Sequence, residues 1–353
     1  MDILQQEKEL TYSSLRNKER LPLERLLPLS FPLSIYIEVT NRCNFRCKFC
    51  PESFDDFAEK TGGIVNLDLR LYQRIIREIV DHGVTKVLRF YMMGEPLLNQ
   101  NLTEMIGEAK REGIERTELT TNGTLLSPSL GQKLIDCGLD YIRISIYAVD
   151  QDRHERITGS RFRVAKIIDN IKRLKRLRDS SSTHHPHIYV KMIDSLDERE
   201  NRLFIETYQE IGDEVVVEKP MNWNGYENRN LIENAYSASG IENSVELLNQ
   251  VELYEYKKEV CPFPFYSLVI NSNADVVVCC VDWNRSTKIG NLKNKTLTEI
   301  WNGEELRQFR DMQLSRRRNT NPSCKNCVFL YTSPDNLDRI SPEKIEAILR
   351  GVA

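Results

Sequence analysis

The chain has 353 residues, of which 40% are hydrophobic and 29% are charged, and its formal net charge at pH 7 is −3. This length allows one large domain and a smaller one, and the charge argues against a nucleic acid as partner because nucleic-acid-binding domains are usually strongly basic. No apolar run reaches the roughly 18 residues of a membrane-spanning helix, and the polar residues 1–8 lack the apolar stretch of a secretory signal. We therefore expect a cytoplasmic protein that binds neither a membrane nor a nucleic acid.

The first two thirds of the chain alternate between strand and helix patterns. Residues 1–32 are charged and rich in leucine, and we expect a short helical lead segment there. Strands are then predicted at 33–40, 86–92, 116–121, 141–147, 187–193 and 214–218, and amphipathic helices at 68–82, 102–112, 128–137, 164–178 and 198–211. Six such units predict a parallel sheet covered by helices, which forms either a doubly wound sheet or an incomplete barrel.

Three cysteines, Cys43, Cys47 and Cys50, lie within eight residues directly after the first predicted strand. Chemistry gathers at the carboxyl ends of barrel strands, and thiolates are the usual ligands of iron–sulfur clusters. Three thiolates would leave one iron of a four-iron cluster free to bind another molecule. A zinc site would need a fourth ligand, which this loop lacks, and three buried free thiols are the remaining alternative.

The other six cysteines fall into one isolated residue and one group. Cys137 ends a predicted helix, and we expect it to be a core thiol. After residue 220 the alternation stops, and a hairpin at 266–271 and 276–280 and a helix at 297–312 are predicted. Four cysteines in this part could close a second cluster for electron transfer or structure, or form a zinc ribbon: Cys261, Cys279, Cys324 and Cys327.

Cys280 directly follows Cys279. Neighbouring residues of a strand point to opposite faces, so only one of the two can bind the same metal centre. We expect Cys279 to be the ligand and Cys280 to be a core thiol, with an exchange of the two roles as the alternative.

The cysteine loop, with Phe49 between its last two cysteines, resembles the signature loop of the radical S-adenosylmethionine (radical SAM) enzymes. This resemblance implies an α/β fold with a partial (β/α)6 barrel, and a cluster whose free iron binds S-adenosylmethionine and cleaves it to a 5′-deoxyadenosyl radical. Residues at other strand ends resemble the cofactor-binding elements of this family, although Met93 replaces the first glycine of the usual Gly-Gly-Glu. The expected cofactor-binding residues are Gly94, Glu95, Thr121, Asn122, Ser145 and Lys191, with Met192 as an alternative to Lys191.

Residues 152–159 resemble the segment that covers the cofactor in this family, but a solvated charged loop explains them equally well. We expect no catalytic role for His154.

The segment from Cys261 to Cys327 resembles the "twitch" half of the SPASM auxiliary domain, including the Ile-Gly-Asn-Leu sequence at 289–292. This resemblance implies one auxiliary [4Fe-4S] cluster in addition to the SAM-binding [4Fe-4S] cluster. We expect a lead segment at 1–32, a radical SAM partial barrel at 33–220, a smaller C-terminal α+β auxiliary-cluster domain at 221–335 and a C-terminal helix at 336–353.

The resemblance further implies a radical SAM oxidoreductase that oxidises a secondary alcohol of a sugar or aminocyclitol, with flavodoxin or ferredoxin as electron donor. The substrate is expected near residues 219–225, although an ordinary connecting loop is an equal alternative, and no catalytic base is assigned. A peptide-modifying maturase is the second hypothesis, with a peptide as partner. The 32 residues before the first strand are too few for the leader-peptide module that many maturases carry. The third is a non-catalytic iron–sulfur electron-transfer protein, which would not need the matches at Gly94–Glu95 and Thr121–Gly123.

Overall fold

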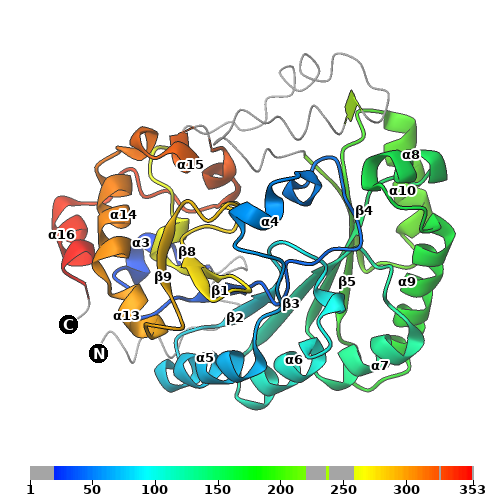
Figure 1. Cartoon of the computed structure of the whole chain (residues 1–353), viewed down its shortest axis with the longest axis horizontal. Coiled ribbons are helices and arrows are strands. Elements are labelled where there is room, and N and C mark those ends of the chain that lie inside the picture. Colours follow the sequence, from blue (N-terminus) through cyan, green and yellow to red (C-terminus); the bar gives the residue numbers. More distant parts are fainter. Residues whose placement is uncertain (1–19, 220–235, 238–257, 326, 352–353) are drawn as a thin grey trace.

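The computed structural model describes residues 20–219, 236–237, 258–325 and 327–351 (Figure 1). Its α-helices are α3 (Leu23–Leu26), α4 (Phe57–Lys60), α5 (Leu69–His82), α6 (Leu102–Arg111), α7 (Pro128–Asp136), α8 (Gln151–Thr158), α9 (Val164–Asp179), α10 (Glu198–Tyr208), α13 (Leu297–Trp301), α14 (Glu304–Leu314), α15 (Pro322–Lys325) and α16 (Pro342–Arg350). Its strands are β1 (Ser34–Ile37), β2 (Val87–Phe90), β3 (Arg116–Thr121), β4 (Tyr141–Ile146), β5 (His187–Ile193), β6 (Glu214–Glu218), β7 (Ser267–Ile270), β8 (Asp275–Val277) and β9 (Lys288–Asn291). Short 3-10 turns lie at Pro51–Ser53, Pro96–Leu98, Phe263–Phe265, Arg318–Thr320 and Phe329–Thr332.

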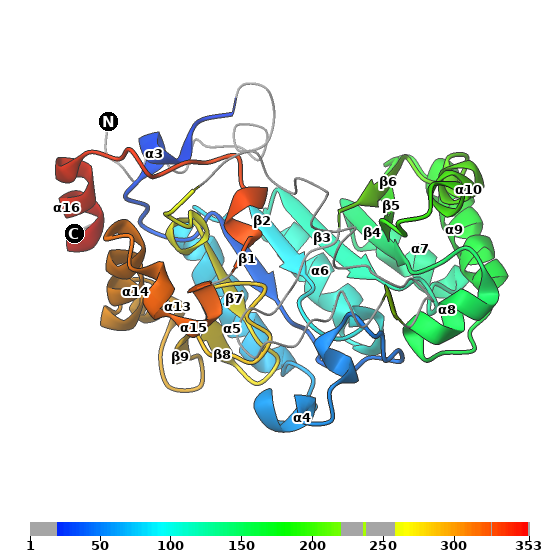
Figure 2. The ribbon, with the colours of Figure 1, turned by 90° about the horizontal axis from the view of Figure 1, so that it is seen from above.

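The strands form one sheet in the order β6-β5-β4-β3-β2-β1-β7-β8-β9. Strands β1 to β6 are parallel, β7 is parallel to β1, and β8 and β9 run antiparallel. β6 and β9 are the two ends of this order, so the sheet curves without closing (Figures 1 and 2). The predicted partial barrel is therefore confirmed, and the strands of the C-terminal part extend the sheet of the barrel.

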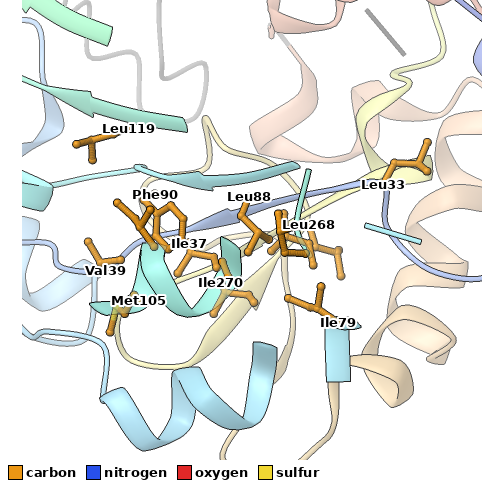
Figure 3. Close-up of a cluster of buried hydrophobic side chains, with 14 of the residues drawn as sticks. Leu33, Ile37, Val39, Ile79, Leu88, Phe90, Met105, Leu119, Leu268 and Ile270 are labelled. Atoms are coloured by element: carbon orange, nitrogen blue, oxygen red, sulfur yellow. The ribbon is translucent and has the colours of Figure 1, made fainter. Parts of the chain in front are cut away.

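One face of the sheet carries the main hydrophobic core. Alternate strand residues such as Ile37, Leu88, Phe90 and Ile270 are fully buried there against the helices (Figure 3). The amphipathic pattern of α5 explains its position, since Ile75, Ile76 and Ile79 lie on its buried side. The Asp68 side chain accepts the Leu71 N–H at the start of this helix, and Gly83, with φ of 67°, ends it.

Two sequence expectations about local structure are wrong. The helix predicted at 297–312 is split into α13 and α14, because the backbone at Gly303 is extended (φ −72°, ψ 159°) and turns the chain between them. The charged stretch 152–159 is the helix α8 rather than a solvated loop, and His154 on it is 1% exposed. The Asp150 side chain caps the start of α8, and Gly159, with a left-handed backbone (φ 66°), ends the helix. An aspartate before a helix and a glycine after it are the sequence signals that indicated these boundaries.

A buried carboxylate joins β1 to the C-terminal strands. Glu38, which is 1% exposed, accepts hydrogen bonds from the Ser272 N–H (3.1 Å) and hydroxyl (2.8 Å) and from Arg285 Nη2 (3.2 Å). The Arg285 side chain is 5% exposed and also lies 3.9 Å from Asp275. Glu38 thus links the end of the first barrel strand to the turn after β7, through Ser272, and to the segment between β8 and β9, through Arg285.

We expect Glu38→Ala to lower the free energy of unfolding by about 3 kcal/mol, because removing one partner of a buried pair leaves the other charge uncompensated. Urea denaturation followed by circular dichroism measures this change. The matched control is Lys295→Ala, whose pair with Glu305 (2.9 Å) is half exposed, and which should cost about 0.5 kcal/mol or less. Equal losses in the two variants would contradict the role assigned to Glu38.

Candidate functional site

Cys43, Cys47 and Cys50 lie on the loop that follows β1, at the carboxyl end of the strand. The Cys50 N–H donates to the Cys47 carbonyl (2.9 Å), which closes a turn between these two thiols. The C-terminal end of α8 holds the loop from outside, since the Arg46 N–H donates to the Thr158 carbonyl and the Lys48 N–H to the Ile157 carbonyl (both 2.8 Å). The loop is therefore fixed by the neighbouring helix before any metal binds.

Aromatic rings surround these thiols. Tyr147, directly after β4, stacks on Phe49 with ring centroids 5.4 Å apart and contacts the edge of Phe45 at 5.8 Å. His154 lies edge-on to Phe45 at 5.5 Å, and neither of its buried ring nitrogens has a hydrogen-bond partner among the described residues. Burial lowers the pKa of His154, so the ring is held neutral. Three aromatic side chains and a neutral imidazole therefore pack around this part of the cysteine loop.

Burial also controls the charge of the thiols. It raises the pKa of Cys43 to about 12 and raises the pKa of Cys47 and Cys50 further above the usual range. Without a bound cation the thiols are therefore neutral, and a metal centre would bind them by displacing their protons.

Three thiols on one loop are a donor set that fits a [4Fe-4S] cluster. In a [4Fe-4S] cluster each thiolate binds a different iron, so its thiols need not converge on one point. A tetrahedral zinc site requires such convergence.

The segment after β2 packs directly on the cysteine loop. The Glu95 N–H donates to the Arg42 carbonyl (2.6 Å), one residue before Cys43. Gly94 has φ of 78°, and a Cβ at this position would lie 2.8 Å from the Arg42 carbonyl oxygen and closer still to that of Thr40. Glycine is therefore required here both by the backbone conformation and by the close approach of the two loops.

The Glu95 side chain joins this segment to the turn after β3. It accepts hydrogen bonds from the Thr121 hydroxyl (2.7 Å), the Asn122 N–H (2.7 Å) and the Leu97 N–H (3.1 Å). The Asn122 side chain in turn donates to Asn44 of the cysteine loop (2.8 Å). Burial raises the pKa of Glu95 to about 7, against the effect of these three donors. The structure thus brings Gly94, Glu95, Thr121 and Asn122 together around the cysteine loop.

Ser145 and Lys191 lie opposite each other on β4 and β5, on the face of the sheet turned away from the helices. Lys191 Nζ is 2.7 Å from Glu218 Oε2, and Arg143 Nη2 is 3.1 Å from Glu218 Oε1. Met192 faces the opposite way and is 1% exposed in the helix-side core, so its expected alternative role in cofactor binding has no support in the structure. The cofactor contacts of Ser145 and Lys191 stay predictions.

We expect Gly94→Ala to lower the free energy of unfolding more than Gly113→Ala. Gly113 also has a positive φ (90°), but a Cβ there would meet nothing within 4 Å, so the control carries only the backbone strain of about 1–2 kcal/mol. The extra loss at Gly94 measures the clash with the cysteine loop. Urea denaturation of the metal-free proteins gives both values, and equal losses would contradict the close packing of the two loops.

The second group of cysteines lines one cavity. Cys261, Cys279, Cys324 and Cys327 all border a space of about 580 Å³, which includes its open mouth. Cys280 does not line it. It packs instead, together with Tyr36, Cys50 and Phe54, against a small apolar cluster made of Phe57, Met92, Met93, Val269, Val277 and Trp283. Both cysteines lie after the end of β8 at Val277, so the strand expected to reach Cys280 is shorter, and the choice of Cys279 as the ligand stays a prediction.

Polar side chains surround the second group of thiols as well. Arg318 Nη2 donates to the carbonyls of Cys324 and Cys327 (2.6 Å each), and Gln313 Nε2 lies 3.7 Å from Cys324 Sγ. Burial raises the pKa of Cys324 to about 12, and the nearby Arg318 charge opposes that rise. The cavity therefore has the thiol set and the positive charge that fit a thiolate-bound [4Fe-4S] cluster.

Sequence reasoning missed several residues of these sites: Tyr147, Trp283, Gln313 and Arg318. Tyr147 is the last residue of a predicted strand and Trp283 lies four residues after Cys279, so their positions were weak signals. Gln313 and Arg318 reach the cavity from α14 and the turn after it, which no spacing rule indicates. The predicted substrate segment 219–225 lies, beyond residue 219, outside the described residues.

We expect the wild-type protein, isolated without oxygen, to bind about eight irons, and the triple variant with Cys43, Cys47 and Cys50 changed to alanine to bind about four. The variant with Cys261, Cys279, Cys324 and Cys327 changed to alanine should also keep about four. Cys137→Ala is the control, because Cys137 packs against the core and its thiol donates to the Leu134 carbonyl (3.3 Å), and it should leave the iron content unchanged. Iron and acid-labile sulfide analyses measure these contents. Zinc in either site, or loss of all iron in either variant, would contradict two separate clusters.

Comparisons with family models agree with this organisation. Residues 37–194 match the radical SAM superfamily, and residues 261–328 match SPASM, an iron-sulfur cluster-binding domain. These ranges include all seven expected ligand cysteines. The first domain implies a [4Fe-4S] cluster and S-adenosylmethionine, and the second implies additional iron–sulfur binding.

Among curated relatives, the chain is similar to the tungsten-containing aldehyde ferredoxin oxidoreductase cofactor-modifying protein of Pyrococcus furiosus, with 25% identity over 83% of this chain and 86% of that protein. It is also similar to GTP 3′,8-cyclase of Staphylococcus haemolyticus, with 39% identity, but this match spans only 38% of this chain and 40% of the cyclase. No helix in the described part of the chain has the length and apolar character needed to span a bilayer.

Solved structures share the fold. The crystal structure of Streptococcus suis SuiB bound to precursor peptide SuiA gives a TM-score of 0.61 at 17% identity, covering 87% of this chain and 74% of that one. The crystal structure of BtrN in complex with AdoMet and 2-DOIA gives a TM-score of 0.54 at 18% identity, covering 84% and 93%. At these identities the likeness concerns the fold alone.

Proposed function

Because the chain belongs to the radical SAM superfamily and carries a SPASM-type iron–sulfur domain, we propose that it oxidises a secondary alcohol of a small polar molecule, such as a sugar or aminocyclitol, to a ketone. When bound, the cofactors supply an adenosyl radical that removes the carbinol hydrogen atom and an auxiliary cluster that accepts the remaining electron. The alcohol thereby loses one hydrogen atom, one proton and one electron. A reduced donor protein, such as flavodoxin or ferredoxin, supplies the electron that starts the reaction.

The observation that carries this proposal is the second, four-thiol cavity. Four thiolates occupy every iron of a cubane, so such a cluster has no position for substrate and is suited to accept an electron. A hydrogen-atom abstraction alone would not need it, whereas an oxidation needs a place for the second electron. Cys50 packs against the small apolar cluster that contains Trp283, and Trp283 also lines this cavity, so the two sites adjoin the same packed group.

The polar face of the barrel supports a polar substrate. Glu218 accepts hydrogen bonds from Lys191, Arg143 and the Tyr189 hydroxyl (3.0 Å), and all four side chains lie on the face turned away from the helices. Hydroxyl groups can exchange hydrogen bonds with such a set.

A peptide is the second candidate substrate. The fold of SuiB bound to its precursor peptide is the more similar of the two structures described above, with a TM-score of 0.61. BtrN, which has the lower score, was solved with AdoMet and 2-DOIA. A non-catalytic electron-transfer role is less favoured, because it would need no S-adenosylmethionine, whereas residues 37–194 match the radical SAM superfamily.

We expect the reconstituted protein, given dithionite and S-adenosylmethionine, to release 5′-deoxyadenosine, and a sugar alcohol deuterated at its carbinol carbon to transfer the deuterium to that product. Mass spectrometry measures the label and the ketone that forms in equal amount. Sugar, aminocyclitol and peptide pools are incubated separately. Consumption of a peptide alone would replace the first proposal by the second.

The control separates cofactor cleavage from oxidation. The variant that lacks the four cavity cysteines should still cleave S-adenosylmethionine but should form no more than a tenth of the ketone. Full ketone formation in this variant would contradict the electron-accepting role of the second cluster. Loss of cleavage in the Cys43, Cys47 and Cys50 variant concerns the first cluster alone and would not contradict that role.

A further inference from the structure

Trp283 has a buried polar group that no described residue satisfies. Its side chain is 1% exposed, and its indole Nε1–H has no hydrogen-bond partner among the described residues. Trp283 also lines the cavity that Cys261, Cys279, Cys324 and Cys327 share. Leaving a buried N–H donor without an acceptor costs about 1–3 kcal/mol, so an acceptor inside the cavity would remove that cost.

The indole ring is held in place from both sides. Its face stacks on Phe57, with an interplanar angle of 18° and centroids 6.0 Å apart, and Phe54 packs against it at 5.4 Å. The loop that carries it is fixed by Asp282, whose carboxylate accepts hydrogen bonds from the Ser286 N–H (3.0 Å) and the Thr287 N–H (2.7 Å). The ring therefore cannot easily turn to bring its N–H to water.

The other buried tryptophan shows the contrast. Trp301 is also 1% exposed, but its Nε1–H donates to the Leu29 carbonyl (3.1 Å), and it does not line the cavity. The two indoles differ in the partner of the N–H, not in burial. Of these two described tryptophans, Trp283 is the one whose N–H has no acceptor among the described residues.

We propose that Trp283 donates its indole N–H to a sulfur atom of the auxiliary cluster and thereby raises the reduction potential of that cluster. This inference rests on the proposed second cluster, not on the identity of the substrate. Hydrogen bonds to the sulfurs are one of the factors that set cluster potentials. The reduced cluster carries one more negative charge than the oxidised one, so a donor stabilises the reduced state more.

This assignment makes Trp283 a positioning residue for electron acceptance. A higher potential favours transfer of an electron from a substrate radical to the cluster. The same ring contacts Phe54 and Phe57, which follow Cys50 in the chain, so the residue that adjusts the second site also packs against the segment of the first.

The test compares Trp283→Phe with Trp301→Phe by redox titration followed by electron paramagnetic resonance, without substrate. Both titrations use the background in which Cys43, Cys47 and Cys50 are alanine, so only the auxiliary cluster contributes. We expect Trp283→Phe to keep the iron content but to shift the oxidised–reduced equilibrium about tenfold toward the oxidised cluster, which is about 59 mV for one electron. Trp301→Phe should leave the potential unchanged and lower only the free energy of unfolding. An unchanged potential in Trp283→Phe would overturn the proposal.

A second measurement needs no change at Trp283. In the protein that carries Trp223→Phe and Trp301→Phe in the same cysteine background, Trp283 is the one tryptophan left in the sequence. With ¹⁵N in its indole ring, pulsed electron paramagnetic resonance should detect a ¹⁵N coupling to the reduced cluster. Absence of this coupling would overturn the proposal even if Trp283→Phe fails to fold. Because neither measurement uses substrate, a wrong substrate class leaves both results interpretable.

Discussion

Strand β1 is hydrogen-bonded to β2 on one side and to β7 on the other, and both neighbours run parallel to it. Paired strands lie about 4.8 Å apart, so this double pairing fixes the cysteine loop after β1 relative to the C-terminal strands. Glu38 adds a buried link at the same place by binding Ser272 and Arg285. The two groups of thiols therefore lie on segments attached to one continuous sheet, and a separation of β1 from β7 would break its backbone pairing.

Buried polar groups near the thiols fall into two kinds. Glu95 uses its carboxylate entirely within the protein, where it holds the turn at Thr121 and Asn122 against the cysteine loop. His154 and Trp283, in contrast, have ring nitrogens without partners among the described residues, and each lies beside one of the two thiol groups. The first kind builds the scaffold, and the second kind has no hydrogen-bond partner among the described residues.

The sequence predicted the six parallel strands and the helices between them because each strand is buried on the helix side and each helix has one apolar face. It also located both cysteine groups, because the positions of cysteines along the chain are read directly from the sequence. It did not predict that β7 joins the barrel sheet beside β1, because that pairing depends on residues more than 200 positions apart. The sequence did not reveal the break at Gly303, because the hydrophobic period of the predicted helix continues across it. The turn is visible only in the backbone conformation.

The residues between the two thiol groups come from the same segments as the thiols. Phe54 and Phe57 follow Cys50, and Trp283 follows Cys279, so each segment supplies both ligands and the aromatic contact to the other segment. Cys280 packs against the same apolar group and lies outside the cavity that Cys279 lines. Of these two adjacent cysteines, Cys279 therefore borders the cavity, whereas Cys280 packs against the apolar group that the two segments share. Loss of order in either segment would disturb both thiol groups, which couples the assembly of the two sites through packing alone.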